Sequence, residues 1–131
     1  MKILFICDGN VARSQEAELF VNELSNGGHQ ATSAGVNPKI GKPIDPNVVE
    51  VMKEIGYSMN TSVRKGIDEA VVDKVNMIVS FKPEEELPEF VRRKDNLSYW
   101  NVADPARQSI EFHRKVRDLV KAKVESLLEE I

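Results

Sequence analysis

The chain has 131 residues, of which 41% are hydrophobic and 30% are charged, and its formal net charge at pH 7 is −3. This composition is typical of a globular protein and excludes a disordered chain. The small net charge gives no general attraction to nucleic acid or to an anionic membrane, so anion binding requires a local site. No apolar run approaches the roughly 20 residues of a membrane-spanning helix. No secretory signal follows Lys2, so we expect a cytoplasmic protein with no membrane partner.

The length fits one domain, which we expect to cover residues 1–131. The chain contains a single cysteine, Cys7, which excludes an internal disulfide and an internal thiol relay. No His, Cys, Asp and Glu residues have the spacing of metal ligands, so the sequence predicts neither a metal nor another cofactor.

The chain begins with a strand, a loop and a helix. The apolar residues 2–6 predict a short buried strand that delivers Cys7 at its end. From Ser14 onward the apolar spacing is helical, and the predicted helix stops at Gly27 and Gly28.

A second pair of elements has the same order. Residues 30–35 predict a strand. Asp45 as N-cap and Pro46 in the first turn predict a helix that ends at about Ile55, before Gly56. This order favours a second strand-and-helix unit.

The second half of the chain contains two further strands and a long helix. A short helix is expected over residues 68–74, and strands are expected over 76–81 and 96–100. Residues 82–95 include two prolines and mixed charge, which indicate a loop or a short surface helix. Apolar residues at three-to-four spacing over about the last 20 residues predict an amphipathic helix.

The alternation of these elements defines the expected fold class. Strands that alternate with helices predict an α/β protein, here a three-layer doubly wound sandwich around a four-stranded parallel sheet. In an open α/β sheet the ligand crevice lies at the carboxyl ends of the strands. Cys7 lies at one such end, so we expect the functional site around it.

The loop after the first strand has the composition of an oxyanion site. Backbone amides in such a loop and at a helix start can converge on a phosphate-like anion. Gly9 can supply a conformation that a Cβ would forbid, and Asn10 tolerates the left-handed region. The planar fork of Arg13 suits two oxygens of a tetrahedral oxyanion. The expected oxyanion-binding residues are Asp8, Gly9, Asn10, Val11, Ala12, Arg13 and Ser14.

Cys7 is the candidate nucleophile of this loop. A cysteine at a helix N-terminus near an arginine ionises more readily than a free one. Because nucleophilicity falls as ionisation becomes easier, the benefit lies in the departure of the sulfur from a thiophosphate intermediate. Ser14 can donate a hydrogen bond to that sulfur. A solitary cysteine is more often a buried apolar residue, but its spacing to Arg13 and Ser14 favours the catalytic interpretation.

The segment "CDGNVARS" fits a C-x5-R-S signature and resembles the low-molecular-weight protein tyrosine phosphatases and the arsenate reductases that share their fold. The resemblance continues through "SAG", "DPNVVEVMKEIGYSMNTS" and "YWNVADPAR". It implies a phosphatase-loop fold in which Cys7 is the nucleophile, Arg13 binds the oxyanion and Asp104 of "DPAR" is the general acid. A carboxyl in a negatively charged, partly desolvated mouth could protonate a leaving oxygen and later deprotonate water. Without the resemblance, Asp-Pro would be taken as a turn.

Two branches of this superfamily remain as interpretations. Gln15 and Ala106 are similar to the reductase branch, whereas the phosphatases tend to have a proline after the serine and an aromatic residue after Asp-Pro. Thioredoxin-coupled reductases need two further cysteines, one of them after the third strand, where this chain has "SFKPEEELPEF". Arsenate reduction would therefore need an external thiol, while hydrolysis needs only Cys7, Arg13, Asp104, the loop amides and water.

The sequence thus favours a cysteine-dependent phosphatase that hydrolyses phosphate monoesters of the aryl phosphate or phosphotyrosine type through a phosphocysteine. A thiol-dependent arsenate reductase comes second, and a non-catalytic oxyanion-binding module third, since a binder has no need for Cys7 or Asp104. The absence of an aromatic residue after Pro105 weighs against phosphotyrosine specificity. Asp8 is expected to face the mouth and to repel acidic substrates.

Overall fold

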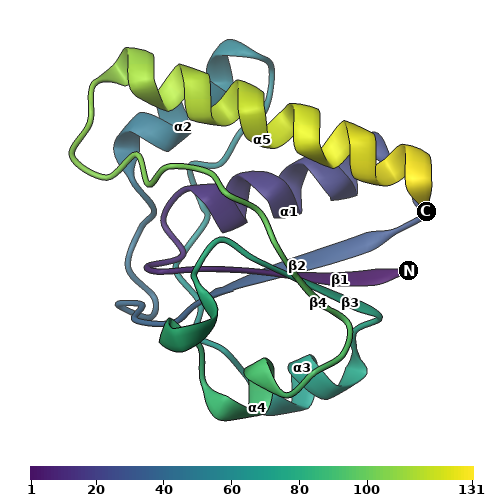
Figure 1. Ribbon diagram of the computed structural model, residues 1–131. Coiled ribbons are helices and arrows are strands. Elements are labelled where there is room, and N and C mark those ends of the chain that lie inside the picture. The colour runs from purple at the N-terminus through teal and green to yellow at the C-terminus, as the bar shows by residue number, and fades with distance from the viewer.

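The computed structural model describes residues 1–131, and a four-stranded parallel sheet lies at its centre (Figure 1). The strands lie in the order β2-β1-β3-β4, and every neighbouring pair is parallel. Their bounds are β1 Lys2–Cys7, β2 Gln30–Gly35, β3 Met77–Ser80 and β4 Leu97–Tyr99. The four strands and their order along the chain confirm the sequence prediction, although β1 includes Cys7 itself.

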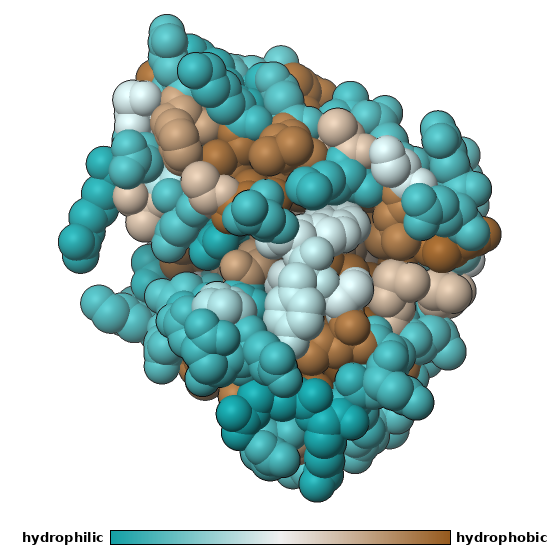
Figure 2. Space-filling view, in the orientation of Figure 1, coloured by the Kyte–Doolittle hydropathy of each residue, from teal (hydrophilic) through white to brown (hydrophobic).

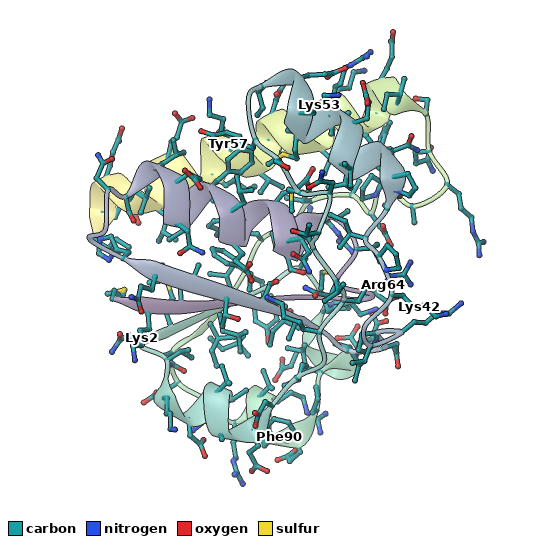
Figure 3. The ribbon with its side chains drawn as sticks, turned by 180° about the vertical axis from the view of Figure 1, so that it is seen from behind. Lys2, Lys42, Lys53, Tyr57, Arg64 and Phe90 are labelled. Atoms are coloured by element: carbon teal, nitrogen blue, oxygen red, sulfur yellow. The ribbon has the colours of Figure 1, made fainter.

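Helices cover both faces of the sheet, which gives the expected three layers. Figure 1, and Figure 3 from behind, show α1, α2 and α5 on one face and α3 and α4 on the other. Their bounds are α1 Arg13–Leu24, α2 Pro46–Glu54, α3 Glu69–Lys74, α4 Glu89–Arg92 and α5 Ile110–Glu130, with a 3₁₀ turn at Glu84–Glu86. Residues 82–95, for which the sequence indicated a loop or a short surface helix, therefore contain two short helical segments, the 3₁₀ turn and α4.

The alternation of side chains along β1 divides the core into two parts. Ile3, Phe5 and Cys7 belong to a buried cluster with α1, α2 and α5, whereas Leu4 and Ile6 belong to a smaller cluster with α3 and α4. Successive residues of a strand point to opposite faces, so an unbroken apolar run is what a sheet covered on both sides requires. Cys7 shares the face of Ile3 and Phe5 and therefore lies on the α1 side of the sheet.

Local signals predicted from the sequence fix the helix ends. The Asp45 side chain accepts a hydrogen bond from the Asn47 amide at 2.9 Å and caps α2, as expected. Gly56 follows the cap of α2 with a φ of 94°, as expected. The predicted stop of the first helix at Gly27 and Gly28 was late, because α1 ends at Leu24, and Asn26, with a φ of 51°, takes the left-handed conformation after the cap Ser25. The helix α1 begins at Arg13, one residue earlier than predicted.

The exterior of the molecule is mostly polar. Hydrophilic side chains cover most of the face in Figure 2, with apolar surface in patches between them. No helix is both long enough and apolar enough to cross a bilayer. Both chain termini lie at one end of the sheet, and the loop after β1 lies at the opposite end (Figure 1).

Candidate functional site

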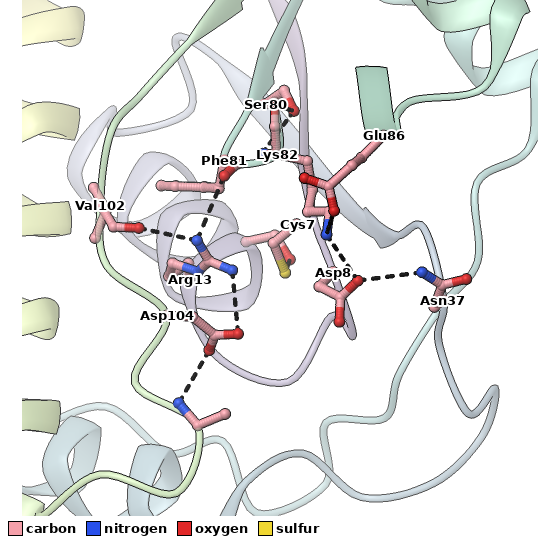
Figure 4. Close-up of polar contacts among 12 residues, drawn as sticks. Cys7, Asp8, Arg13, Asn37, Ser80, Phe81, Lys82, Glu86, Val102 and Asp104 are labelled. Carbon is pink, nitrogen blue, oxygen red and sulfur yellow. Dashed lines mark hydrogen bonds and ion pairs between the residues drawn. The ribbon is translucent and has the colours of Figure 1, made fainter. Parts of the chain in front are cut away.

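The structure brings the three candidate catalytic residues together at the carboxyl edge of the sheet. Cys7 ends β1, Arg13 begins α1, and Asp104 belongs to the segment between β4 and α5. Figure 4 shows Arg13 beside Cys7 and Asp104 directly below Arg13. The residues that sequence spacing and the resemblance picked out are therefore neighbours in space.

A chain of two hydrogen bonds leads to the sulfur of Cys7. The Sγ atom of Cys7 lies 2.9 Å from the Oγ atom of Ser14, and both side chains are buried. The Ser14 hydroxyl also accepts a hydrogen bond of 2.8 Å from the Asn10 amide. Because Asn10 occupies an acceptor position of the hydroxyl, the hydroxyl proton is free to point at the sulfur. This is the contact expected for stabilising a thiolate.

Asn10 holds the loop in shape. Its φ of 56° lies in the left-handed region, as the sequence predicted for this residue. Its side chain also donates to Ser33 at 2.9 Å and accepts from the Gln15 side chain and the Lys65 amide at 2.8 Å each. A fully buried amide that makes four hydrogen bonds is satisfied and rigid.

Gly9 was expected to adopt a conformation that a Cβ would forbid, and this expectation was wrong. Gly9 does not adopt a positive φ, and a Cβ on it would only contact the Val11 side chain at 3.5 Å. The glycine that the loop requires is Gly35 at the end of β2, where a Cβ would meet backbone atoms of Asp8, Gly9 and Asn10 at 2.8 to 2.9 Å. The only sequence signal for Gly35 was its place in the "SAG" segment of the resemblance.

The backbone amides of the loop have no partners in the chain. None of the amides from Asp8 to Ala12 donates a hydrogen bond to another group, and no side chain caps α1. Unpaired amides next to an uncapped helix start are available to the oxygens of an anion.

Two backbone carbonyls hold the guanidinium of Arg13. One of its terminal nitrogens (NH1) donates to the Val102 carbonyl at 2.9 Å and to the Phe81 carbonyl at 3.5 Å. The guanidinium carbon lies 5.6 Å from the centre of the Phe81 ring. The residue is 6% exposed, so its planar group is fixed before any substrate arrives.

Asp104 contacts the other side of the same guanidinium. Its Oδ2 atom lies 3.7 Å from the second terminal nitrogen (NH2) of Arg13, and its Oδ1 atom accepts a hydrogen bond of 3.0 Å from the Ala106 amide. The side chain is 48% exposed. The sequence suggested a negatively charged, partly desolvated mouth; the carboxylate is about half buried, and its charged partner is the cation Arg13.

The environment of Asp8 also differs from the expectation. Its carboxylate lies 3.1 Å from the Nζ atom of Lys82 and accepts a hydrogen bond of 3.2 Å from Asn37. Partial burial would raise the pKa of Asp8, but the Asn37 hydrogen bond and the Lys82 ammonium outweigh burial and hold the pKa below its ordinary value. Sequence reasoning missed Lys82, the cation that pairs with Asp8. Because this cation offsets the carboxylate, Asp8 is not the isolated negative charge that was expected to repel acidic substrates.

A buried carboxyl lies behind the loop in the first turn of α1. Glu16 is 1% exposed, and its Oε1 atom has no hydrogen-bond partner. Burial raises the pKa of Glu16 to about 8, against the opposing effect of the cations Arg117 and Arg13. Glu16 therefore stays protonated at neutral pH.

A doubly wound parallel sheet with a cysteine at the end of its first strand, followed six residues later by an arginine, is the arrangement of the low-molecular-weight phosphatase and arsenate reductase superfamily. The chain matches the family described as low molecular weight phosphotyrosine protein phosphatase over residues 2–131. It belongs to that family, as the sequence motifs predicted.

Relatives within this family carry names from both branches. The chain is 30% identical to the glutaredoxin arsenate reductase of Synechocystis sp., over 99% of this chain and 98% of the relative. It is 29% identical to a solved arsenate reductase in the phosphate-binding state, with a TM-score of 0.85 and coverage of 99% and 98%. It is 26% identical to a solved low molecular weight protein tyrosine phosphatase from T. tengcongensis, with a TM-score of 0.89 and coverage of 100% and 99%.

These similarities define an enzyme family whose members are phosphatases or arsenate reductases.

Proposed function

We propose that the protein is a cysteine-dependent phosphatase that hydrolyses phosphate monoesters through a phosphocysteine intermediate. The observation that carries this proposal is the composition of the site: one sulfur, Cys7, with the Arg13 guanidinium and the Asp104 carboxylate 3.7 Å apart beside it. These groups, the loop amides and water suffice for hydrolysis. A reductive cycle needs a second thiol, which the chain does not contain.

The first step transfers the phosphoryl group to sulfur. The Cys7 thiolate attacks phosphorus in line with the leaving oxygen, so an S–P bond forms as the P–O bond breaks. The loop amides and Arg13 bind the three equatorial oxygens, on which charge is spread in the transition state. Asp104 enters this step in its protonated form and donates that proton to the leaving alcohol or phenol.

The second step returns the enzyme to its starting state. Asp104, now a carboxylate, accepts a proton from water as the water oxygen attacks phosphorus. The S–P bond breaks, the electron pair stays on Cys7, and inorganic phosphate leaves. The Ser14 hydroxyl at 2.9 Å donates to the departing sulfur and stabilises its charge.

A specific observation supports a second candidate, arsenate reduction with an external thiol. The Synechocystis relative is named a glutaredoxin arsenate reductase, and a reductase of that kind would take its second sulfur from another molecule. Cys7 would attack arsenate and release water, and an external thiol would then attack Cys7 to form a mixed disulfide. The two electrons of that oxidation reduce arsenic to arsenite, and a further thiol regenerates Cys7.

One experiment separates these functions. The purified protein is incubated with phenyl phosphate, and separately with arsenate and glutathione, while phenol and arsenite are measured. We expect phenol release that disappears in the Cys7→Ser variant. Arsenite formation that requires glutathione, without phenol release, would establish the reductase instead. Phosphate binding without either product would leave an oxyanion-binding module.

A further inference from the structure

Two pairs of opposite charges lie on either side of Cys7. Arg13 and Asp104 form one pair, and Lys82 and Asp8 form the other (Figure 4). The mechanism above assigns roles to the first pair only. The second pair brings a cation from the segment after β3 to the residue that directly follows the nucleophile.

Lys82 is held in a fixed position. Its Nζ atom lies 3.1 Å from Asp8 and 2.8 Å from Glu86, and its side chain is only 15% exposed. The backbone of Lys82 is fixed by Ser80, whose hydroxyl accepts from the Lys82 amide at 2.9 Å and donates to the Lys82 carbonyl at 2.8 Å. The adjacent Phe81 carbonyl accepts from Arg13. A single short turn after β3 thus positions two cations at the mouth of the site.

Asp8 without this partner would oppose anion binding. Its carboxylate belongs to the loop whose amides are unpaired, and it is close enough to Arg13 for that cation to lower the pKa of Asp8. The unpaired Asp8 carboxylate would repel a phosphate dianion about twice as strongly as a monoanion, because the Coulomb energy is proportional to the charge of the ligand.

We propose that Lys82 is a specificity-determining residue of the oxyanion site, where its ammonium offsets the Asp8 carboxylate and lets the site accept a dianion. This inference rests on the proposed oxyanion site but not on hydrolysis. The charged groups that face this corner are Asp8 and Arg13 from the first loop and α1, and Glu86 from the 3₁₀ turn. The Asp8 and Lys82 pair keeps both of its charges between pH 5 and 7.5, since the surrounding groups hold the pKa of Asp8 below and the pKa of Lys82 above their ordinary values.

The test measures binding of phenyl phosphate by calorimetry in a Cys7→Ser background, where neither turnover nor thiol ionisation contributes. The second pKa of a phosphate monoester is about 6, so the ligand is mostly a monoanion at pH 5 and mostly a dianion at pH 7.5. We expect Lys82→Met to weaken binding about five- to tenfold at pH 7.5 and only about two- to threefold at pH 5, because the Coulomb energy halves with the ligand charge. Binding of arsenate is measured in parallel, so that the effect of Lys82 on oxyanion binding is tested whether or not the protein hydrolyses phosphate monoesters.

The matched variants distinguish a charge effect from a folding effect. Asp8→Asn with Lys82 intact should bind the dianion more tightly, and Asp8→Asn combined with Lys82→Met should recover most of the lost affinity. Lys94→Met, which removes an ion pair with Asp73 of 2.6 Å remote from Cys7, should change neither value. Equal weakening at both pH values, or a double variant weaker than Lys82→Met, would overturn the assignment. If the Cys7→Ser protein bound neither ligand, the proposed function itself would fail.

Discussion

Gly35 lies so close to Asp8 that a Cβ on the glycine would meet the Asp8 carbonyl oxygen at 2.8 Å. The contact joins the end of β2 to the first residue of the candidate oxyanion loop. Both partners are backbone, so neither can move aside by changing a side-chain rotamer. The shape of the loop therefore depends on a missing side chain in the neighbouring strand.

Gly35→Ala should destabilise the protein by about 2 kcal/mol and weaken phosphate binding, because the new methyl group displaces the loop backbone. Thermal melts and phosphate calorimetry measure the two effects. Gly66→Ala is the matched control, since the nearest atom to its Cβ would be the flexible end of the Ile40 side chain at 3.2 Å, and Pro38 would lie at an ordinary contact distance of 3.5 Å. A smaller effect at Gly35 than at Gly66 would contradict this account of the loop.

Ser14→Ala should slow the second half of the reaction more than the first. The variant removes the donor 2.9 Å from the Cys7 sulfur, and hydrogen bonds to charged groups contribute about 1.5–3 kcal/mol. Hydrolysis of the phosphocysteine should slow about tenfold or more, so a pre-steady-state burst of 4-nitrophenol should become larger relative to steady turnover. Ser14→Thr, which keeps the hydroxyl, is the control. A proportional loss of burst and steady rate would count against this role for Ser14.

Asp104→Asn should discriminate between leaving groups. A general acid contributes typically 10²- to 10⁴-fold, and most where the leaving oxygen is strongly basic. The variant should therefore lose far more activity on phenyl phosphate than on 4-nitrophenyl phosphate. Steady-state kinetics on both esters tests this, and equal losses would remove Asp104 from the acid role.

Glu16→Met should stabilise the protein more at pH 8 than at pH 5. In the unfolded chain Glu16 ionises near pH 4.5, whereas burial holds its proton to about pH 8 in the folded protein. Between these values the unfolded state binds fewer protons, so the carboxyl lowers stability as pH rises, by at most about 1.4 kcal/mol per pH unit. Melts of wild type and variant at both pH values measure the difference. Glu23→Met, on the exposed side of α1, should show no such pH dependence.

Local sequence signals predicted the part of the site that lies within one stretch of chain. Cys7, Arg13 and Ser14 belong to a strand end, a short loop and a helix start, and their spacing alone brings them to one place. The cap at Asp45 is equally local. Asp104 required the resemblance, because no spacing rule joins residue 104 to residue 7.

The remaining parts of the site depend on contacts between distant segments. Lys82 and Asn37 reach Asp8 only after β2 and β3 have paired with β1 on either side. The sequence pointed to Gly9, whereas the structure requires a glycine at Gly35, and the cause is the same. The close approach of the two backbones at Gly35 is set by the pairing register of β1 and β2 and not by the sequence of the loop. The pairing of the Asp8 carboxylate with Lys82 and Asn37 could therefore not be predicted from the loop sequence.

The four hydrogen bonds of the Asn10 side chain carry a thermodynamic consequence for ligand binding. They fix the loop before an anion arrives, so the chain entropy of ordering it is lost during folding and not during association. Oxyanion binding to this protein should then be rapid, with little change in heat capacity and no slow rearrangement phase.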